Sequence, residues 1–401
     1  CISLCPATKL PHTACLGHKM SGTCPARIAV DPTVSVDTGG PEALVQLALV
    51  LKSLCNSTFV LTMPQPIHHR FRTEYPEINF IAQLRKQDLR SGDVLIAPDV
   101  ATCDEGVVKR GVTWYMWILS SKARKHNWRT LTRGCRLLSH NHWLAHDTLS
   151  GIRLQSQWQL NPYISPSIVR RCAAHSSDSA SRRRLVLLDS DTPGASIPCV
   201  HHHTLGTDLR SSLTMRRSSV YTHIPTLRAD KVEDEVERAC AVTGCESMRV
   251  ANRSRAEVHS LLSSAMVIVD WCMIGSERMP IEGVLCGAVL LTNECKCGQD
   301  MADFPIPRRN VLRSVHNISS AISRIVSNFR VEQQGYRHMR RKYRTLGARS
   351  LQRQATAFLT AHAASVGVRK YKKLYGPHSP DSLTLKHAAD LAQQEGFRGG
   401  A

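Results

Sequence analysis

The chain has 401 residues, of which 42% are hydrophobic, so wholesale disorder is excluded and two domains could each bury a core. The net charge of +20 favours acidic partners such as phosphates, nucleic acid, anionic membranes or acidic glycans, and a solvated basic surface explains it equally well. No stretch reaches the roughly 18 to 20 uninterrupted apolar residues of a membrane helix, so we expect no transmembrane segment in this chain.

The fifteen cysteines leave the compartment open between the cytoplasm and the lumen of the Golgi or secretory pathway. Several lie in an irregular leader, residues 1–26, where they indicate either disulfides or a loop-rich metal site. Sequons at Asn56, Asn252 and Asn317 add weak support for the secretory pathway, since a chain rich in serine and threonine contains some by chance. Because the chain begins at Cys1 rather than at methionine, we expect it to be truncated, with room for a signal or anchor upstream.

Alternating strands and helices are predicted over residues 27–172. The apolar run 27–37 predicts a strand, and the glycines that follow it, Gly39 and Gly40, mark a turn. A helix is predicted next, because apolar residues recur there at i, i+3, i+4 and i+7: Leu44, Leu47, Ala48 and Leu51. Further strands are predicted at 57–63, 92–99, 111–121 and 135–141. Continuous apolar strands that alternate with helices indicate a parallel sheet covered on both faces.

The pattern restarts after a polar segment, 173–183, which we interpret as a linker. The second half, 184–330, again predicts strands and helices, among them a strand at 184–191 and helices at 230–244 and 254–265. C-terminal helices are expected at 331–365, followed by a tail at 366–401. The sequence therefore predicts an α/β protein with two Rossmann-like domains that face a cleft.

One stretch in the second half places charges where a ligand would bind. Met266–Asp270 predicts a strand, and the helix that follows has Pro280 in its first turn and ends at Gly287. The loop between them lies at the carboxyl edge of the sheet, where open α/β sheets bind ligands. The helix start attracts phosphate, Arg278 offers a bidentate contact, and Glu282 can accept hydrogen bonds from sugar hydroxyls.

The same charges have a purely structural interpretation. A glutamate in the first turn of a helix stabilises the helix dipole by roughly 0.3–1 kcal/mol without any ligand. Arg278 would then form a surface ion pair with Glu277 or Asp270. The spacing of these residues alone does not distinguish the two interpretations.

The segment "GSERMPIEGVLCGAVLLT", 275–292, resembles the donor-binding segment of GT-B glycosyltransferases, particularly the retaining, glycogen-synthase-like group. The resemblance implies that Glu282 contacts the nucleotide ribose. The donor diphosphate would then lie on the loop and helix start, 275–282, with Gly275, Ser276 and Arg278 as donor-binding residues. The other glutamate of the family motif falls at Ile274 in this chain, and the nearby Glu277 is a candidate catalytic residue.

The N-terminal "DTGGPEALVQLALVL" is similar to the glycine-rich first loop of the same fold, which lines the acceptor side. The resemblance implies that residues 27–172 form the acceptor-side domain, with Gly39 and Gly40 in its loop. Residues 184–330 would form the nucleotide-sugar-binding domain. His140, near the end of a predicted strand, is a second candidate catalytic or acceptor-side group.

The resemblance implies a glycosyltransferase that moves a sugar from a nucleotide-sugar donor to a glycan or another hydroxyl acceptor. Two alternatives remain: a nucleotide-sugar epimerase of the same fold, and a degenerate, non-catalytic binding protein. A specific nucleic-acid partner is not expected, because the chain lacks the motifs of the known RNA- and DNA-binding modules and has few aromatic residues.

No cofactor or metal is expected. "DSD", Asp189–Asp191, is similar to the metal-binding motif of GT-A glycosyltransferases, but it ends the first strand of the second half, where Asp191 can simply cap a turn. The histidine-rich segments 200–204 and 139–143 lack a set of partner ligands at metal-binding spacing. No P-loop, dinucleotide-binding or serine-hydrolase motif is present.

Overall fold

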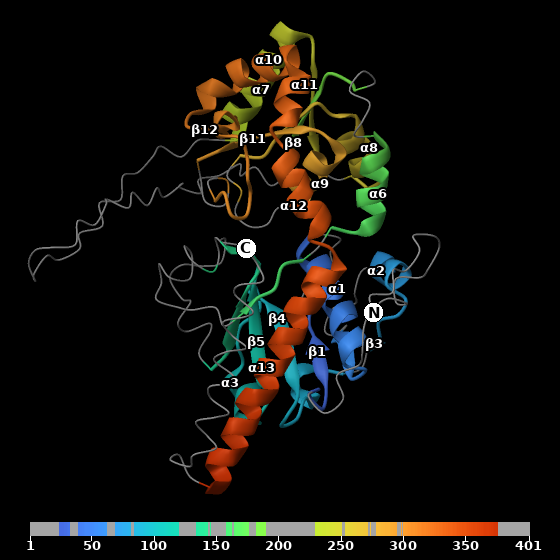
Figure 1. The fold of residues 1–401 in the computed structure, drawn as a ribbon, viewed down its shortest axis with the longest axis vertical. Helices are drawn as coiled ribbons and strands as arrows, with labels where there is room; N and C mark the ends of the chain where they lie inside the picture. The colour runs from blue at the N-terminus through green and yellow to red at the C-terminus, as the bar shows by residue number, and fades with distance from the viewer. Residues whose placement is uncertain are drawn as a thin grey trace, which may run out of the picture. The chain divides into compact units, whose positions relative to one another are not determined.

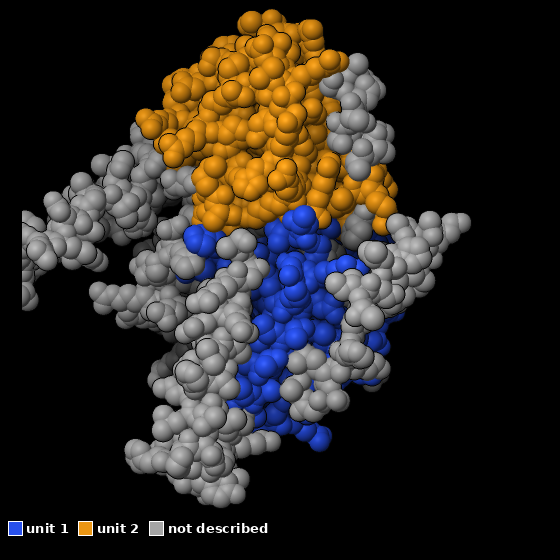
Figure 2. Space-filling model, viewed as in Figure 1, with its two compact units in different colours: residues 1–164, 345–401 blue, residues 165–344 orange. Residues whose placement is uncertain are grey.

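The computed structural model forms two compact units, one of residues 1–164 with 345–401 and one of residues 165–344 (Figure 2). We call them unit 1 and unit 2. The structure describes residues 24–32, 39–61, 69–81, 84–119, 134–142, 145, 158–162, 164–175, 182–189, 229–250, 253–271, 273, 278–294, 298 and 300–375.

Unit 1 contains a parallel sheet of seven strands in its described residues, in the order β3-β2-β1-β4-β5-β6-β7 (Figure 1). Its strands are β1 (Ile28–Val30), β2 (Thr58–Leu61), β3 (Phe80–Ile81), β4 (Val94–Pro98), β5 (Thr113–Ile118), β6 (Arg136–Ser139) and β7 (Trp158–Gln159). The order reverses at β1, which pairs with β2 on one side and β4 on the other. Such a reversal is the switch point at which α/β sheets bind ligands.

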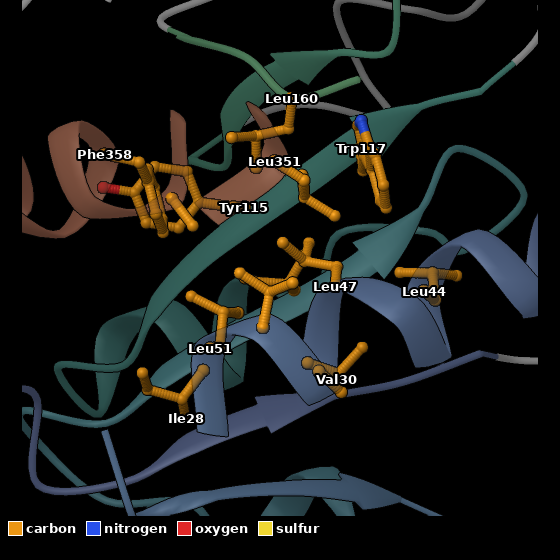
Figure 3. Packing of buried hydrophobic residues seen from close by; sticks show 14 of the residues in the cluster. Ile28, Val30, Leu44, Leu47, Leu51, Tyr115, Trp117, Leu160, Leu351 and Phe358 are labelled. Atoms are coloured by element: carbon orange, nitrogen blue, oxygen red, sulfur yellow. The ribbon is translucent and has the colours of Figure 1, made fainter. Parts of the chain in front are cut away.

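Helices cover this sheet: α1 (Gly39–Leu54), α2 (His69–Glu74), α3 (Glu105–Lys109) and α13 (Ala348–Tyr375), with a short helical turn, η1 (Lys86–Asp88). The predicted apolar stripe of α1 is fully buried, and Figure 3 shows part of it, Leu44, Leu47 and Leu51, against the strands. The opposite face of the sheet forms a second core around residues such as Trp114 and Met116. Both faces are therefore covered, as the continuous apolar strands predict.

Helix α13 belongs to unit 1 although more than 180 residues of chain separate it from β7. Its residues Leu351 and Phe358 join the same core as α1 (Figure 3). The Phe358 ring meets Tyr115 edge-on at a centroid distance of 4.8 Å, and the Tyr115 hydroxyl lies 3.1 Å from Nδ1 of His362. The sequence predicts helices here, but it does not reveal that the last one completes the first unit.

Unit 2 contains a parallel sheet of five strands in its described residues, in the order β12-β11-β10-β8-β9. Its strands are β8 (Leu185–Asp189), β9 (Glu246–Val250), β10 (Val267–Val269), β11 (Val289–Asn293) and β12 (Val311–Leu312). The order reverses at β8, which pairs with β9 and β10. Strand β9 is absent from the sequence prediction because "ESMRV" is only partly buried at the sheet edge and lacks an apolar run.

The helices of unit 2 are α6 (Pro166–His175), α7 (Ala229–Thr243), α8 (Arg255–Ser264), α9 (Arg278–Cys286), α10 (Ile318–Ser327), α11 (Phe329–Gln334) and α12 (Arg337–Thr345), with the turns η4 (Arg308–Asn310) and η5 (Val315–Asn317). Helix α6 packs against α9, and a disulfide joins their residues Cys172 and Cys286. The predicted start of the linker, residue 173, therefore falls inside a helix of unit 2, and residues 176–181 lie outside the described part.

Three further disulfides join described cysteines: Cys24–Cys55, Cys103–Cys135 and Cys240–Cys245. Cys24 is the last cysteine of the predicted leader, and its disulfide fixes the chain just before β1 to the end of α1. Of the two alternatives for the leader cysteines, a disulfide or a metal site, Cys24 forms a disulfide. None of the described helices is long and apolar enough to cross a membrane.

Candidate functional site

The candidate donor site lies at the carboxyl edge of the unit 2 sheet, where β10 leads into α9. Asp270 follows β10 directly and is buried, and its backbone N–H donates to the Leu291 carbonyl at 3.0 Å. Helix α9 begins at Arg278 and has Pro280 in its first turn, as the sequence predicts. The predicted site residues Gly275, Ser276 and Glu277 lie outside the described residues.

Two glycines allow α9 to pack closely on its surroundings. A Cβ atom on Gly283 would lie 1.7 Å from Cδ1 of Ile268, so only glycine permits this approach of α9 to β10. Gly287 ends the helix at a φ of 100°, a backbone conformation that residues other than glycine rarely adopt. The small residues of "EGVLCG" therefore serve the close packing of the helix onto the sheet.

Glu282 has no exposed surface, and its carboxylate lies against the side chains of two arginines and a histidine. Its Oε1 atom is 2.5 Å from Nη2 of Arg255 and 3.2 Å from Nε of Arg278, and its Oε2 atom is 3.5 Å from Nε2 of His259. Arg278 comes from the same helix, one turn earlier. We call these four residues the Glu282 cluster.

Helix α8 supplies both Arg255 and His259. The two residues are four apart, so they share a face of the helix. Ser254 fixes the start of α8, because its side chain accepts from the Glu257 N–H while the Glu257 carboxylate accepts from the Ser254 N–H at 2.8 Å. The sequence analysis does not name Arg255 and His259 as site residues. The signal that could have identified them is their spacing of four residues on the predicted helix 254–265.

The surroundings keep Glu282 ionised. Burial alone would raise its pKa, but Arg255, His259 and Arg278 outweigh burial and lower the pKa to about 2. An ionised carboxylate in a buried position is tolerated only where cations and hydrogen bonds compensate its lost hydration. The prediction that Glu282 lies in the first turn of the helix is wrong, because α9 begins at Arg278 and places Glu282 one turn further in. Arg278 does form an ion pair, with Glu282 itself at 3.2 Å.

The Glu282 cluster also retains hydrogen-bonding capacity. Oε2 of Glu282 and Nε2 of His259 are buried and form no well-aligned hydrogen bond with the described residues. Buried polar atoms in native proteins are nearly always satisfied by protein, water or ligand. Because Glu282 has no exposed surface, a hydroxyl group reaches Oε2 only if His259, whose Nε2 atom lies 3.5 Å away, moves aside.

The predicted acceptor-side residues lie at the carboxyl edge of the unit 1 sheet. His140 follows β6, is buried, and has its ring 6.0 Å from that of Trp117 on β5. Gly39 and Gly40 are the first residues of α1 rather than a turn before it, and a Cβ on Gly40 would lie 3.7 Å from the Leu119 side chain just after β5. Trp117, which was not predicted as a site residue, has a buried indole N–H without a hydrogen-bond partner among the described residues.

The predicted absence of a metal site remains a prediction. Asp189 is the last residue of β8, whereas Ser190 and Asp191 lie outside the described residues, as do the histidines of 200–204. Within the described ranges, no group of three histidine, cysteine, aspartate or glutamate side chains is arranged to hold a metal ion.

Comparison with known proteins identifies the fold. No family model and no curated protein matches the sequence. Among solved structures, Anabaena HepE in complex with UDP and glucose matches with a TM-score of 0.53 and 9% identity, over 84% of this chain and 99% of that chain. The chain thus has the fold of GT-B glycosyltransferases, as the resemblance of residues 275–292 predicts.

Two further matches have lower TM-scores. A glycosyltransferase from Rickettsia africae matches with a TM-score of 0.45 and 8% identity, over 83% of this chain and 98% of that chain. A putative UDP-N-acetylglucosamine 2-epimerase from Listeria monocytogenes also matches with a TM-score of 0.45 and 8% identity, over 84% of this chain and 97% of that chain.

Proposed function

We propose that the protein is a glycosyltransferase that transfers a sugar from a nucleotide-sugar to a hydroxyl group of a glycan or another acceptor. The observation that carries this proposal is the Glu282 cluster: an ionised, buried carboxylate one turn inside a helix at the carboxyl edge of the sheet. The GT-B fold supports it at the level of architecture.

The donor nucleotide would span the first turn of α9. Its ribose hydroxyls donate hydrogen bonds to Oε2 of Glu282, while its phosphates lie at the helix start, where the backbone N–H groups and Arg278 carry positive charge. One helical turn, about 5.4 Å, separates the two positions, and a nucleoside diphosphate places its hydroxyls and phosphates at a comparable spacing. UDP is the first nucleotide to test, because the HepE complex contains it.

In the reaction, the acceptor oxygen forms a bond to the anomeric carbon of the sugar, and the bond from that carbon to the diphosphate breaks. Arg278 and the start of α9 stabilise the negative charge that develops on the leaving diphosphate, so the step requires no metal. The acceptor proton passes to a base, and His140 of unit 1 remains a candidate catalytic or acceptor-side group. Glu277 remains a candidate catalytic residue.

The test is a turnover assay with UDP-, GDP-, ADP- and CMP-sugars, with and without a mixture of glycan and lipid acceptors. Released nucleotide and glycosylated product are measured by mass spectrometry. We expect acceptor-dependent release of nucleotide that Arg278→Gln abolishes and that Arg308→Gln, an exposed arginine on η4, leaves unchanged. Conversion of the sugar without acceptor would identify an epimerase, and nucleotide binding without turnover would identify a degenerate binding protein; either result contradicts the proposal.

A further inference from the structure

Four arginines of unit 2 interact electrostatically with one another and have no carboxylate partner among the described residues: Arg182, Arg337, Arg340 and Arg344. We call them the arginine cluster. We infer that this cluster, centred on Arg340, is an anion site for a phosphate group, separate from the Glu282 cluster. The inference does not depend on the proposed transferase function.

Helix α12 presents three of the arginines on one side. Arg337, Arg340 and Arg344 follow one another at i, i+3 and i+7, so they share a helix face. The helix itself is held firmly, because Met339 and Tyr343 are buried and the Tyr343 hydroxyl donates to the Asp303 carbonyl at 2.8 Å. The backbone that carries the three guanidinium groups is therefore held in place.

Arg340 lies at the border of the buried face and is half-buried. Its Nη1 atom is fully buried and has no hydrogen-bond partner in the structure's described part. A buried N–H group of a charged side chain without an acceptor is costly, and it usually marks a position filled by water or an ion. Arg340 is thus the member of the cluster whose buried N–H group would gain an acceptor from a bound anion.

Several other arginines of unit 2 have carboxylate partners. Arg309 and Arg324 both bind Glu332, and further pairs among the described residues are Arg183–Glu246, Arg249–Glu233 and Arg313–Glu294. Acidic residues of unit 2 thus pair with several of its arginines. Among the described residues, none of them pairs with an arginine of the cluster.

Arg182 adds a buried charge to the cluster. Its Nη1 atom donates to the Ala265 carbonyl at 2.5 Å and its Nη2 atom donates to the Cys286 carbonyl, while its buried Nε atom has no acceptor among the described residues. Carbonyl dipoles thus take the place of a counter-ion. Because Arg182 precedes β8, it lies at the amino edge of the sheet, whereas the Glu282 cluster lies toward the carboxyl edge.

The electrostatics agree with this geometry. Burial and then the nearby charge of Arg340 lower the pKa of Arg182 to about 10. Burial and then the charges of Arg344 and Arg337 lower the pKa of Arg340 as well. The cations thus repel one another, and a bound anion would relieve this repulsion.

A phosphate group fits the cluster better than a halide or a single carboxylate. Guanidinium groups bind phosphate through two parallel N–H···O bonds, and the several oxygens of a phosphate accept from more than one arginine at once. The group can belong to a small soluble molecule or to a phospholipid headgroup, and the experiment separates these two sources.

The experiment measures binding of inorganic pyrophosphate by isothermal titration calorimetry to the full chain, with saturating UDP present. We expect Arg340→Gln to weaken binding by about tenfold or more, the loss of one charge-assisted hydrogen-bonded contact. The double variant Arg337→Gln/Arg344→Gln, at two exposed positions, should weaken it as well and guards against misfolding of the first variant.

Two control variants decide the result. Arg308→Gln removes the same charge from an exposed position of unit 2, and Arg278→Gln removes it from the Glu282 cluster. Equal weakening in Arg308→Gln would show only general charge attraction, and weakening confined to Arg278→Gln would place pyrophosphate at the donor helix; both results overturn the inference. If UDP fails to bind, the proposed function is contradicted while the arginine variants still test this site.

A second arm uses vesicles of phosphatidylcholine with and without phosphatidic acid, and measures co-sedimentation of the protein. Binding to the acidic vesicles that Arg340→Gln abolishes would support the site and assign the phosphate to a lipid. Pyrophosphate binding without vesicle binding would support it with a soluble ligand. Absence of both overturns the inference.

Discussion

At the scale of single residues, Glu282 has two roles that depend on each other. Arg255 and Arg278 hold its Oε1 atom, whereas Oε2 lies 3.5 Å from Nε2 of His259 and is the oxygen that we propose accepts from a ligand. A carboxylate without those arginines would be protonated or expelled from the interior. The ion pairs that stabilise unit 2 are therefore the same contacts that orient the proposed ribose acceptor.

Replacing Glu282 with glutamine should lower the free energy of unfolding by about 3 kcal/mol, because Arg255 and Arg278 lose their buried anionic partner. Urea denaturation followed by circular dichroism measures the change. Glu246→Gln is the matched control: its pair with Arg183 is largely exposed, so we expect a loss below about 1 kcal/mol. Equal losses in the two variants would mean that the Glu282 cluster is not a buried ion-pair network.

The same residue predicts a pH dependence. The pKa of Glu282 is lowered from 4.5 to about 2 on folding, so its ion pairs stabilise the protein fully above pH 4.5. This stabilisation is lost as the pH falls through that window toward 2, because protonation of the carboxyl then favours the unfolded chain. The difference in unfolding free energy between the wild type and Glu282→Gln should shrink over this range; a constant difference would contradict the lowered pKa.

The sequence predicted the positions of Glu282 and Arg278 from a helix start and a motif, but it could not predict their partners. Arg255 and His259 lie on another helix, and only the packing of α8 beside α9 brings them to the carboxylate. Likewise, the sequence indicates His140 because it lies near the end of a predicted strand. It does not predict the neighbouring ring of Trp117, which lies on the adjacent strand β5.

At the scale of elements, the end of α9 depends on Gly287. A side chain there would need the unfavourable φ of 100°, and its Cβ would lie 2.7 Å from Nη2 of Arg182 and 2.9 Å from Nε2 of Gln333. Gly244, which ends α7 at a φ of 65°, has the same type of backbone and open space around it. Comparing alanine substitutions at Gly287 and Gly244 therefore separates the cost of backbone strain from the cost of a steric clash.

We expect Gly287→Ala to lower the free energy of unfolding by about 3 kcal/mol, the sum of backbone strain and a clash in a packed region. Gly244→Ala should cost only the strain, about 1 kcal/mol. Thermal unfolding of both variants provides the comparison. A loss in Gly287→Ala no larger than in Gly244→Ala would contradict the close packing at the end of α9.

Both glycines were predicted as helix ends from the sequence, since glycine after an apolar periodic segment is typical of a C-terminus. The strand β9, in contrast, was missed: its residues are polar or partly exposed, and its place is set by pairing with β8 rather than by its own pattern. Elements with strong internal periodicity were therefore predictable, and elements defined by a neighbour were not.

At the scale of the whole molecule, the chain builds unit 1, then unit 2, and returns to complete unit 1 with α13. The sequence predicted two α/β halves and C-terminal helices, but helix periodicity does not show which sheet a helix will cover. The structure shows that α13 covers the unit 1 sheet, because Leu351, Phe358 and Leu359 are part of the unit 1 core.

A chain that ends at residue 344 should therefore fail to fold unit 1 while unit 2 remains folded. Hydrogen exchange measured by mass spectrometry should show loss of protection in β5, which contacts Phe358 through Tyr115, and retained protection in β10 and β11. A chain that ends at residue 375 is the control and should protect all three strands. Protection of β5 in the shorter chain would contradict the assignment of α13 to the unit 1 core.

We propose that the Glu282 cluster and the start of α9 bind the nucleotide of a sugar donor. Isothermal titration of UDP into the wild type, Arg278→Gln and Arg308→Gln tests it most directly. We predict saturable binding to one site, weakened about tenfold or more in Arg278→Gln and unchanged in Arg308→Gln. UDP binding of equal affinity in all three proteins, or no binding of any nucleoside diphosphate to the wild type, would contradict the claim.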